Sequence, residues 1–402
     1  MHHQKITIKY YFVEDAKSIL RSDRMKIAFD ARGINWYKGT GIGTYAENLL
    51  KSLLSIDSEN KYRIYWSGDD YNTFERENCS VKMASKRYHR FFQEHYFPVD
   101  IKNNSIDIYH ISQNGIGLSE NINCLKVVTI HDLIPYIMPE TVGRGYLIKF
   151  LKYIPRVIET SDAIITVSNC SKNDILKFFP VDPNKIFVTP LATDKIYRPI
   201  DKKYCRDYLS KKYGINNNFI LYIGGFSPRK NVYRLIKAFE MVKSSVQDDV
   251  KLLICGARKD AIETLQTLSD NSKVSSSIIF TDYVEGYDLP IFYNACEIFV
   301  YPSLYEGFGL PPLEAMSCGA PVITSNISSI TEVTNNCALL TNPLDVHELS
   351  SNIYDLLTDK DKRDNWSKKG LIQAGNFSWI KTAAQTLSIY KTLTESNSTE
   401  NS

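Results

Sequence analysis

The sequence lacks most features that mark disulfide-linked, zinc-binding, membrane-spanning or nucleic-acid-binding proteins. Its eight cysteines include no Cys-x-x-Cys pair and no histidine spacing suited to zinc, so we expect reduced, mostly buried thiols. No apolar run approaches the roughly 20 residues that cross a bilayer, which argues against a transmembrane helix. The 48 basic and 45 acidic residues leave a net charge of +3, too little to indicate a nucleic-acid partner.

Three further signals are missing. No Gly-x-Gly-x-x-Gly turn precedes an acidic residue about 20 positions later, which argues against a dinucleotide-dependent oxidoreductase. No Asp-x-Asp pair stands where it would mark a metal site, so we predict no metal and no bound cofactor. The first residues lack the apolar stretch of a secretory signal, and we therefore expect a cytoplasmic protein.

What is present is a regular alternation of short β-branched or aromatic runs with longer helical patterns. This alternation is typical of parallel α/β units. The predicted strands are 26–30, 62–66, 107–111, 126–130, 163–167 and 186–189 in the first half, and 220–223, 251–255, 278–281, 297–301, 321–325 and 338–340 in the second. Six strands in each half predict two Rossmann-like domains.

The domain boundary falls in 191–218, a stretch that carries Pro199 and three consecutive asparagines. We divide the chain into five predicted parts. They are an N-terminal extension at 1–24, a first Rossmann-like domain at 25–195, a second Rossmann-like domain at 196–375, a C-terminal helix at 376–394 and a disordered tail at 395–402.

The strongest motif is EGFGLPPLEAM at residues 306–316. It follows a predicted strand, and its two prolines fit only the first turn of a helix. Gly307 and Gly309 let the backbone approach a ligand, and the free amides of Phe308 and Leu310 at the helix start favour a phosphate. The two carboxylates, Glu306 and Glu314, remain for hydroxyl groups, although Glu314 also fits an ordinary helix start.

This motif resembles the signature of the retaining family 4 glycosyltransferases. The resemblance implies that Glu306 holds the donor sugar and Glu314 the ribose. It implies the fold called GT-B, an α/β architecture of two Rossmann-like domains facing each other across a central cleft. It further implies that the first domain, 25–195, binds the acceptor and that the second, 196–375, binds the nucleotide-sugar. It also implies that the C-terminal helix crosses back onto the first domain.

A second motif, GGFSPRKN, begins at Gly224 and ends a predicted strand with two cations. Arg229 and Lys230 can neutralise a diphosphate leaving group, with Gly225 near it, although a solvated charged turn is the alternative. The segment resembles the Pro-Arg-Lys-Asn variant of mannosyltransferases of surface polysaccharide assembly. Many relatives carry Arg at the position of Phe226, so Lys230 corresponds directly and Arg229 only through this subgroup.

Two strand ends in the first half complete the expected cleft. The loop with Gly41 and Gly43 opens a helix and is similar to a loop that family members place against the donor. His131 ends another strand, where the resemblance places a histidine beside the donor sugar; contact with sugar or acceptor stays open. Asp132 either orients His131 or caps the next turn.

Several weaker matches surround these motifs. Gly256, Tyr283 and Val284 fall where the family surrounds the nucleoside base. Ser168 begins a Val-Ser-x-x-Ser-like turn, for which helix capping is the favoured interpretation. Residues 85–97 mix basic and aromatic side chains, which suits either the anionic inner face of the plasma membrane or a helix that covers the first sheet.

The sequence therefore predicts a retaining, metal-independent hexosyltransferase, with Glu306, His131, Lys230 and Arg229 as its catalytic residues. The favoured reaction moves mannose from GDP-mannose to a lipid-linked oligosaccharide or other glycan in cell-surface polysaccharide synthesis, with a UDP-sugar as the second donor candidate. An epimerase with the same fold and a non-catalytic nucleotide-sugar-binding subunit are the alternatives.

Overall fold

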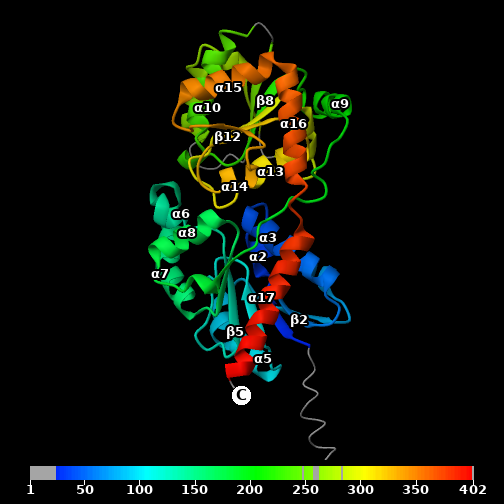
Figure 1. Cartoon of the computed structure of the whole chain (residues 1–402), viewed down its shortest axis with the longest axis vertical. Helices are drawn as coiled ribbons and strands as arrows, with labels where there is room; N and C mark the ends of the chain where they lie inside the picture. The colour runs from blue at the N-terminus through cyan, green and yellow to red at the C-terminus, as the bar shows by residue number, and fades with distance from the viewer. Residues whose placement is uncertain (1–23, 247–248, 257–261, 282–283, 401–402) are drawn as a thin grey trace, which may run out of the picture.

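The computed structural model describes residues 24–246, 249–256, 262–281 and 284–400. These residues form two parallel sheets, of seven and six strands, in two bodies stacked along the long axis of the molecule (Figure 1). The prediction of two Rossmann-like α/β domains is confirmed.

The first sheet has the strand order β3-β2-β1-β4-β5-β6-β7. Its strands are β1 (Lys26–Asp30), β2 (Lys61–Trp66), β3 (Cys79–Met83), β4 (Ile108–Ile111), β5 (Leu125–Ile130), β6 (Ala163–Thr166) and β7 (Ile186–Val188). Its helical segments are α2 (Arg32–Trp36), α3 (Gly41–Ile56), η1 (Tyr71–Phe74), α4 (His89–Phe91), η2 (Phe92–Tyr96), α5 (Phe97–Asn103), α6 (Ile134–Ile137), η3 (Pro139–Thr141), α7 (Arg144–Thr160), α8 (Asn169–Phe178) and η4 (Pro183–Lys185).

The second sheet has the order β10-β9-β8-β11-β12-β13. Its strands are β8 (Phe219–Ile223), β9 (Lys251–Cys255), β10 (Ile278–Thr281), β11 (Ile298–Tyr301), β12 (Val322–Ser325) and β13 (Leu339–Thr341). Its helical segments are α9 (Lys202–Tyr213), η5 (Pro228–Lys230), α10 (Val232–Lys243), α11 (Ile262–Asp270), η6 (Ser275–Ser277), α12 (Leu289–Ala295), α13 (Leu310–Ser317), α14 (Ile330–Thr334), α15 (Val346–Thr358) and α16 (Lys360–Ala374).

The central strands are buried because helices cover both faces of each sheet. Successive side chains of a strand point to opposite faces of the sheet, so the side chains of the first sheet belong to two apolar clusters. Ile27 and Phe29 of β1 join the cluster that contains α3, whereas Ala28 joins the one that contains Phe97 of α5 and Phe150 of α7. Helices α5 and α7 therefore cover the same face of this sheet.

In each sheet the first three strands are added in one direction, and the next strand is then added on the other side of the first one. The point of this reversal lies between β1 and β4 in the first sheet and between β8 and β11 in the second. In open parallel sheets, ligands bind at the carboxyl ends of the strands beside such a point. The loops after β8 and β11 carry the two strongest sequence motifs.

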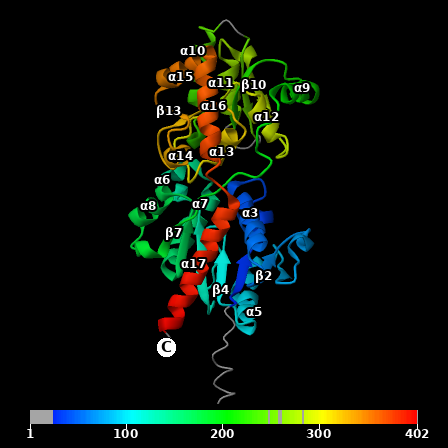
Figure 2. The ribbon, with the colours of Figure 1, turned by 45° about the vertical axis from the view of Figure 1, so that its right-hand side comes forward.

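Helix α17 (Trp379–Glu400) follows α16 and returns to the first sheet (Figures 1 and 2). The hydroxyl of Tyr390 lies 2.5 Å from Nδ1 of His110 on β4, and Thr382 donates a 2.6 Å hydrogen bond to the carbonyl of Pro190. The expectation of a disordered tail after residue 394 is wrong as far as residue 400, because extending a formed helix costs less than starting one. The tail's backbone stays helical there.

Candidate active site

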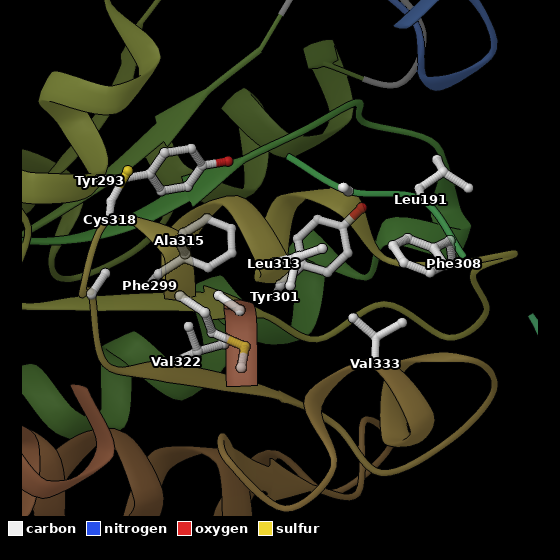
Figure 3. Packing of buried hydrophobic residues seen from close by; sticks show 14 of the residues in the cluster. Leu191, Tyr293, Phe299, Tyr301, Phe308, Leu313, Ala315, Cys318, Val322 and Val333 are labelled. Atoms are coloured by element: carbon white, nitrogen blue, oxygen red, sulfur yellow. The ribbon is translucent and has the colours of Figure 1, made fainter. Parts of the chain in front are cut away.

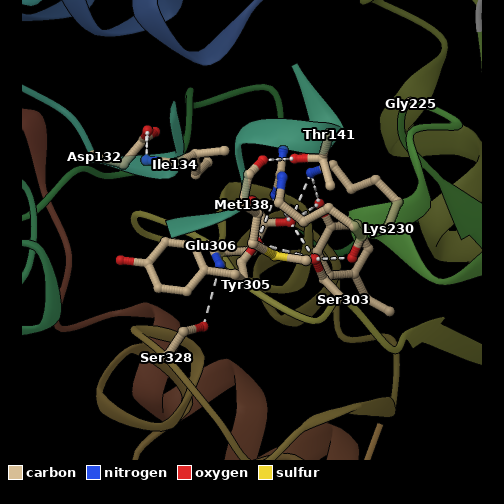
Figure 4. Close-up of polar contacts among 12 residues, drawn as sticks. Asp132, Ile134, Met138, Thr141, Gly225, Lys230, Ser303, Tyr305, Glu306 and Ser328 are labelled. Atoms are coloured by element: carbon tan, nitrogen blue, oxygen red, sulfur yellow. Dashed lines mark hydrogen bonds and ion pairs between the residues drawn. The ribbon is translucent and has the colours of Figure 1, made fainter. Parts of the chain in front are cut away.

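One carboxylate oxygen, Oε1 of Glu306, is the centre of a buried ionic cluster (Figure 4). Nη1 of Arg229 lies 2.9 Å from it and Nζ of Lys230 lies 2.7 Å from it. The hydroxyls of Ser303 and Tyr301 donate to the same oxygen at 2.6 and 3.0 Å. Four donors thus meet at one oxygen of a side chain that the fold almost removes from water.

The two cations decide the charge of Glu306. Burial would raise the pKa of this carboxyl, but the charges of Lys230 and Arg229 lower it to about 2. Burial lowers the pKa of Lys230 against the attraction of Glu306. Burial also opposes the charge of Arg229, but Glu306, Tyr301 and Asp132 together outweigh it and raise the pKa of Arg229. With both cations protonated, the cluster carries one excess positive charge.

The loop after β8 is fastened to the loop after β11. Asn231 donates to the carbonyl of Pro302 at 2.9 Å, and the backbone amide of Leu304 donates to the carbonyl of Arg229 at 2.8 Å. The side chains of Arg229 and Lys230 are only 14% and 15% exposed. The alternative of a solvated charged turn is therefore wrong, and Arg229 points inward.

Helix α13 begins directly after this cluster. Gly309 precedes it with a φ of 110°, a conformation that favours glycine. The hydroxyl of Ser329 donates to the carbonyls of Glu306 and Phe308, at 2.8 Å each, and so holds the loop before the helix. Leu313 and other apolar residues of the helix pack into the core of the second domain (Figure 3). The packing fixes the start of the helix, with Leu310 as its first residue.

Glu314 lies on α13 and belongs to a different cluster from Glu306. The hydroxyl of Tyr293 on α12 donates to its Oε2 at 2.9 Å. Burial raises the pKa of Glu314 to about 7, although hydrogen bonds from Tyr293 and Tyr197 lower it. Sequence reasoning identified Glu314 but missed these two tyrosines, whose positions give no motif.

His131 ends β5 on the opposite domain. Its Nε2 lies 2.9 Å from the carbonyl of Ser112, and its ring packs edge to face on Tyr45 with centroids 4.8 Å apart. A carbonyl only accepts, so Nε2 carries the proton and Nδ1 is an acceptor. Burial lowers the pKa of His131 to about 4, so the ring is neutral near pH 7. Asp132 accepts the amide of Ile134 at 3.0 Å and thus caps the next turn.

The two domains meet at Gly307. A Cβ atom on this residue would lie 2.7 Å from the carbonyl oxygen of His131 and 2.8 Å from Cβ of Asp132. Ser168, which caps α8 by accepting the amide of Ser171, also donates to the carbonyl of Gly307 at 2.6 Å. Capping was expected for Ser168; its contact with the other domain was not. These contacts bring the His131 and Glu306 loops together.

The remaining predicted glycines have different surroundings. A Cβ on Gly41 would lie 3.7 Å from Leu310 of the other domain, whereas one on Gly43 would lie 2.4 Å from the carbonyl of Tyr37 within its own domain. Gly43 therefore allows close packing at the start of α3. The space around Gly225 is open.

The expected nucleoside-base region is described in part. A Cβ on Gly256 would lie 2.2 Å from the carbonyl of Gly224, so this glycine permits close contact between the ends of β8 and β9. Val284 is buried. Tyr283 lies outside the described residues.

The arrangement offers an anion site on one domain beside a neutral histidine on the other. Within the described ranges, no group of three His, Cys, Asp or Glu side chains is placed to hold a metal ion. Two buried cations and a helix start can together bind a diphosphate. Carboxylates near them can accept hydrogen bonds from sugar hydroxyls.

Comparison with known proteins gives two family matches and a relative that is matched over its full length. Residues 206–372 match the family described as Glycosyl transferases group 1, and residues 39–195 match Glycosyltransferase Family 4. O-antigen chain mannosyltransferase B of Escherichia coli is 35% identical over 384 residues, which cover 92% of this chain and 100% of the relative.

Solved structures share the fold at low sequence identity. Sucrose-phosphate synthase from Thermosynechococcus elongatus has a TM-score of 0.74 at 18% identity and covers 93% of this chain and 100% of its own. Alr3699/HepE of Anabaena, solved with UDP and glucose, has a TM-score of 0.73 at 17% identity, covering 92% of this chain and 100% of its own. Both predicted motifs lie within the matched regions, and the chain belongs to the group 1, family 4 glycosyltransferases with the GT-B fold.

Proposed function

We propose that this glycosyltransferase moves mannose from GDP-mannose to a lipid-linked glycan in cell-surface polysaccharide synthesis. The single observation that carries the proposal is the full-length similarity to O-antigen chain mannosyltransferase B. Transfer proceeds with retention and without a metal, at the inner face of the plasma membrane. A UDP-sugar is the second donor candidate.

In the proposed reaction, Lys230 and Arg229 hold the diphosphate. Breaking the bond between sugar and diphosphate builds negative charge on the leaving phosphate, so groups that stabilise this charge lower the barrier. The excess positive charge beside Glu306 supports this role. The amides from Phe308 to Leu310 add hydrogen-bond donors at the start of α13. Together with the two cations, this helix start balances the charge of the diphosphate in place of a metal ion.

Glu306 then exchanges its partners. Without a donor its carboxylate is held by the two cations, whereas a bound diphosphate is a better partner for both because it carries more charge. Glu306 is then released to accept hydrogen bonds from the hydroxyls of the sugar.

Glu314 binds the ribose and His131 faces the sugar or acceptor. Ribose hydroxyls would replace Tyr293 as donors to Glu314, and Gly225, Gly256, Tyr283 and Val284 would surround the base. Neutral His131 offers Nδ1 as an acceptor for a hydroxyl, which suits binding of the attacking acceptor on the face from which the diphosphate leaves. Gly41 would face the donor from the start of α3, and Gly43 would place that start by packing closely on Tyr37.

A transfer assay tests the proposal. The purified protein is incubated with GDP-mannose or a panel of UDP-, ADP- and dTDP-sugars and a mannose-terminated acceptor, and nucleoside diphosphate and products are separated. We expect GDP and a mannosylated acceptor in equal amounts, an unchanged rate in EDTA, and the α-configured donor giving an α-linkage. No product with any acceptor, while the donor is epimerised or merely bound, would instead support the epimerase or the non-catalytic subunit.

A further inference from the structure

Helix α7 presents an apolar and basic outer face to solvent. Ile148, Leu151 and Tyr153 are 59%, 40% and 39% exposed. Lys149 and Lys152 lie between them in the sequence and are exposed as well. Exposed large apolar side chains interleaved with lysines are typical of a surface that binds a partner rather than water alone.

The inner face of α7 fixes this orientation. Phe150 and Ile154 are fully buried against the first sheet, and Val157 is almost so. The helix cannot turn its apolar outer face inward without exposing these three side chains. At 1.5 Å per residue it presents a strip about 25 Å long.

The charge of this strip is positive. Arg144, Lys149 and Lys152 have no carboxylate partner in the part of the chain that the structure describes, while Arg156 pairs with Glu120 at the surface. The one acidic residue on the helix, Glu159, lies in its last turn. The strip therefore complements a negatively charged surface.

The helix starts beside the candidate active site. Asn114 donates to the hydroxyl of Tyr146 in the first turn of α7 at 3.3 Å, and accepts the backbone amide of His131 at 2.9 Å. Two hydrogen bonds thus join the start of α7 to the histidine. In Figure 1 the helix lies on the outside of the lower body, below α6 and α8.

A second apolar and basic segment belongs to the same helical layer. Phe92 of η2 packs on the apolar cluster that contains Phe150 of α7. The preceding residues include exposed Tyr88 and Phe91, at 58% and 55%, beside Arg90. The membrane-contact segment predicted at 85–97 thus packs on the same apolar cluster as α7 and exposes apolar and basic side chains of its own.

We propose that α7 lies flat on an anionic lipid bilayer, with the segment at residues 88–91 as its flank, and so holds the site next to lipid-linked acceptors. Cations with interspersed aliphatic and tyrosine side chains suit the headgroup region, where lysines meet phosphates and apolar side chains enter the acyl boundary. No helix of the described residues is long and apolar enough to cross the membrane, so contact is peripheral. The delivery of acceptor, though not the binding to lipid, rests on the proposed function.

Vesicle flotation tests the docking surface. We compare the full chain, a variant with Ile148→Ser and Leu151→Ser, and a variant with Lys149→Glu and Lys152→Glu, on phosphatidylglycerol-containing and on pure phosphatidylcholine vesicles. A matched control, Ile372→Ser with Lys368→Glu and Lys369→Glu, alters an exposed apolar and basic part of α16. Circular dichroism and thermal melting verify that each variant folds.

We expect the wild type and the control to float with anionic vesicles, the two α7 variants to lose at least tenfold in binding, and salt to weaken binding. Equal flotation of the wild type and both α7 variants overturns the proposal, as does absence of wild-type binding. A wild type that binds both vesicle types equally also overturns it, because the cations would then have no role. If the wild type floats only after a second purified protein is added, α7 is a protein interface instead.

A transfer assay separates this proposal from the function. With a water-soluble acceptor, the α7 variants should keep wild-type rates, whereas with an acceptor embedded in anionic vesicles their rates should fall at least tenfold. Failure of the wild type to transfer mannose to either acceptor refutes the proposed function and leaves the flotation result to stand. Full rates on embedded acceptor in variants that no longer float refute acceptor delivery by α7.

Discussion

At the scale of single residues, the site depends on which anion Arg229 and Lys230 hold. Without a donor that anion is Glu306, whose contacts with Arg229, Lys230, Tyr301 and Ser303 all use one oxygen, Oε1. Breaking a buried ion pair by removing one partner is costly, because the other charge stays buried. A bound diphosphate also supplies negative charge to Arg229 and Lys230. The diphosphate and Glu306 therefore act as alternative counter-ions for these two side chains.

Glu306→Gln tests this exchange. The neutral amide cannot balance the two cations, so we expect a variant that is less stable without ligand but gains more stability than the wild type when GDP is added, since GDP restores a counter-charge. Transfer should fall by about 100-fold or more. Thermal melting with and without GDP and a transfer assay measure both effects. Glu47→Gln, which alters an exposed pair with Lys51, is the control.

The acid stability of the protein should also change in this variant. The folded pKa of Glu306, about 2, lies below its ordinary value of 4.5, so its ionisation stabilises the fold above about pH 4.5 and this stabilisation is lost as the pH falls towards 2. Between about pH 4.5 and pH 2, the free energy of unfolding should therefore fall less in Glu306→Gln than in the wild type. Urea unfolding at pH 6 and pH 3 gives the comparison, and parallel pH profiles in both proteins would contradict it.

Glu314 should give the opposite pH dependence. Burial raises its pKa from 4.5 to about 7, so the folded state favours the protonated form and stability falls as the pH rises from about 4.5 through 7. Glu314→Gln keeps an acceptor for Tyr293 but has no charge. We expect the variant to gain roughly 2 kcal/mol over the wild type at pH 8 and little at pH 5. It should also bind GDP more weakly at pH 8, measured by calorimetry.

At the scale of elements, helix α8 of the first domain is capped by a carboxylate of the second. Glu332 on α14 accepts the backbone amides of Asn169 and Cys170, each at 3.0 Å, and the Asn169 side chain at 3.1 Å. A carboxylate at a helix start satisfies free amides and interacts favourably with the helix dipole. This contact links the two domains.

Glu332→Gln should weaken this link without unfolding either domain. The amide accepts fewer strong hydrogen bonds than a carboxylate, so we expect a loss of about 1 kcal/mol in the domain contact and a modest increase in radius of gyration in low salt. Small-angle scattering measures the change. Glu348→Gln, in the first turn of α15 within the second domain, should leave the radius unchanged. A compact Glu332→Gln protein would show that the contact does not hold the domains together.

The elements also show what sequence can and cannot predict. Buried strands such as β8 and β11 have continuous apolar runs and were predicted, but edge strand β3 was missed because Ser80 and Lys82 interrupt its apolar pattern. Likewise the motifs identified Glu306 and Lys230. They could not show that Tyr301 and Ser303 complete the cluster, since these contacts depend on how the segment from the end of β11 to Glu306 folds back on itself.

At the scale of the whole molecule, the reaction needs the two domains at the right separation. The Glu306 loop and the His131 loop belong to different domains and touch through Gly307, whose missing side chain lets them approach. The start of α3 also faces α13, but there a Cβ on Gly41 would lie 3.7 Å from Leu310, an ordinary contact. The sequence motif interprets Gly307 as a ligand-approach glycine; the contacts show that it is also a spacer between domains.

Gly307→Ala therefore tests whether domain separation limits transfer. The new Cβ would lie 2.7 Å from the carbonyl oxygen of His131, which is backbone and cannot rotate away, so the domains must part by several tenths of an ångström. Each domain keeps its own core, so we expect thermal stability and GDP affinity close to wild type. The kcat should fall at least tenfold, because small misplacements of reacting groups are costly. Gly286→Ala is the control, since a Cβ there meets nothing within 4 Å. A Gly307→Ala enzyme with the wild-type kcat would show that the loops adjust to the methyl group and that this contact does not set the geometry of the reaction.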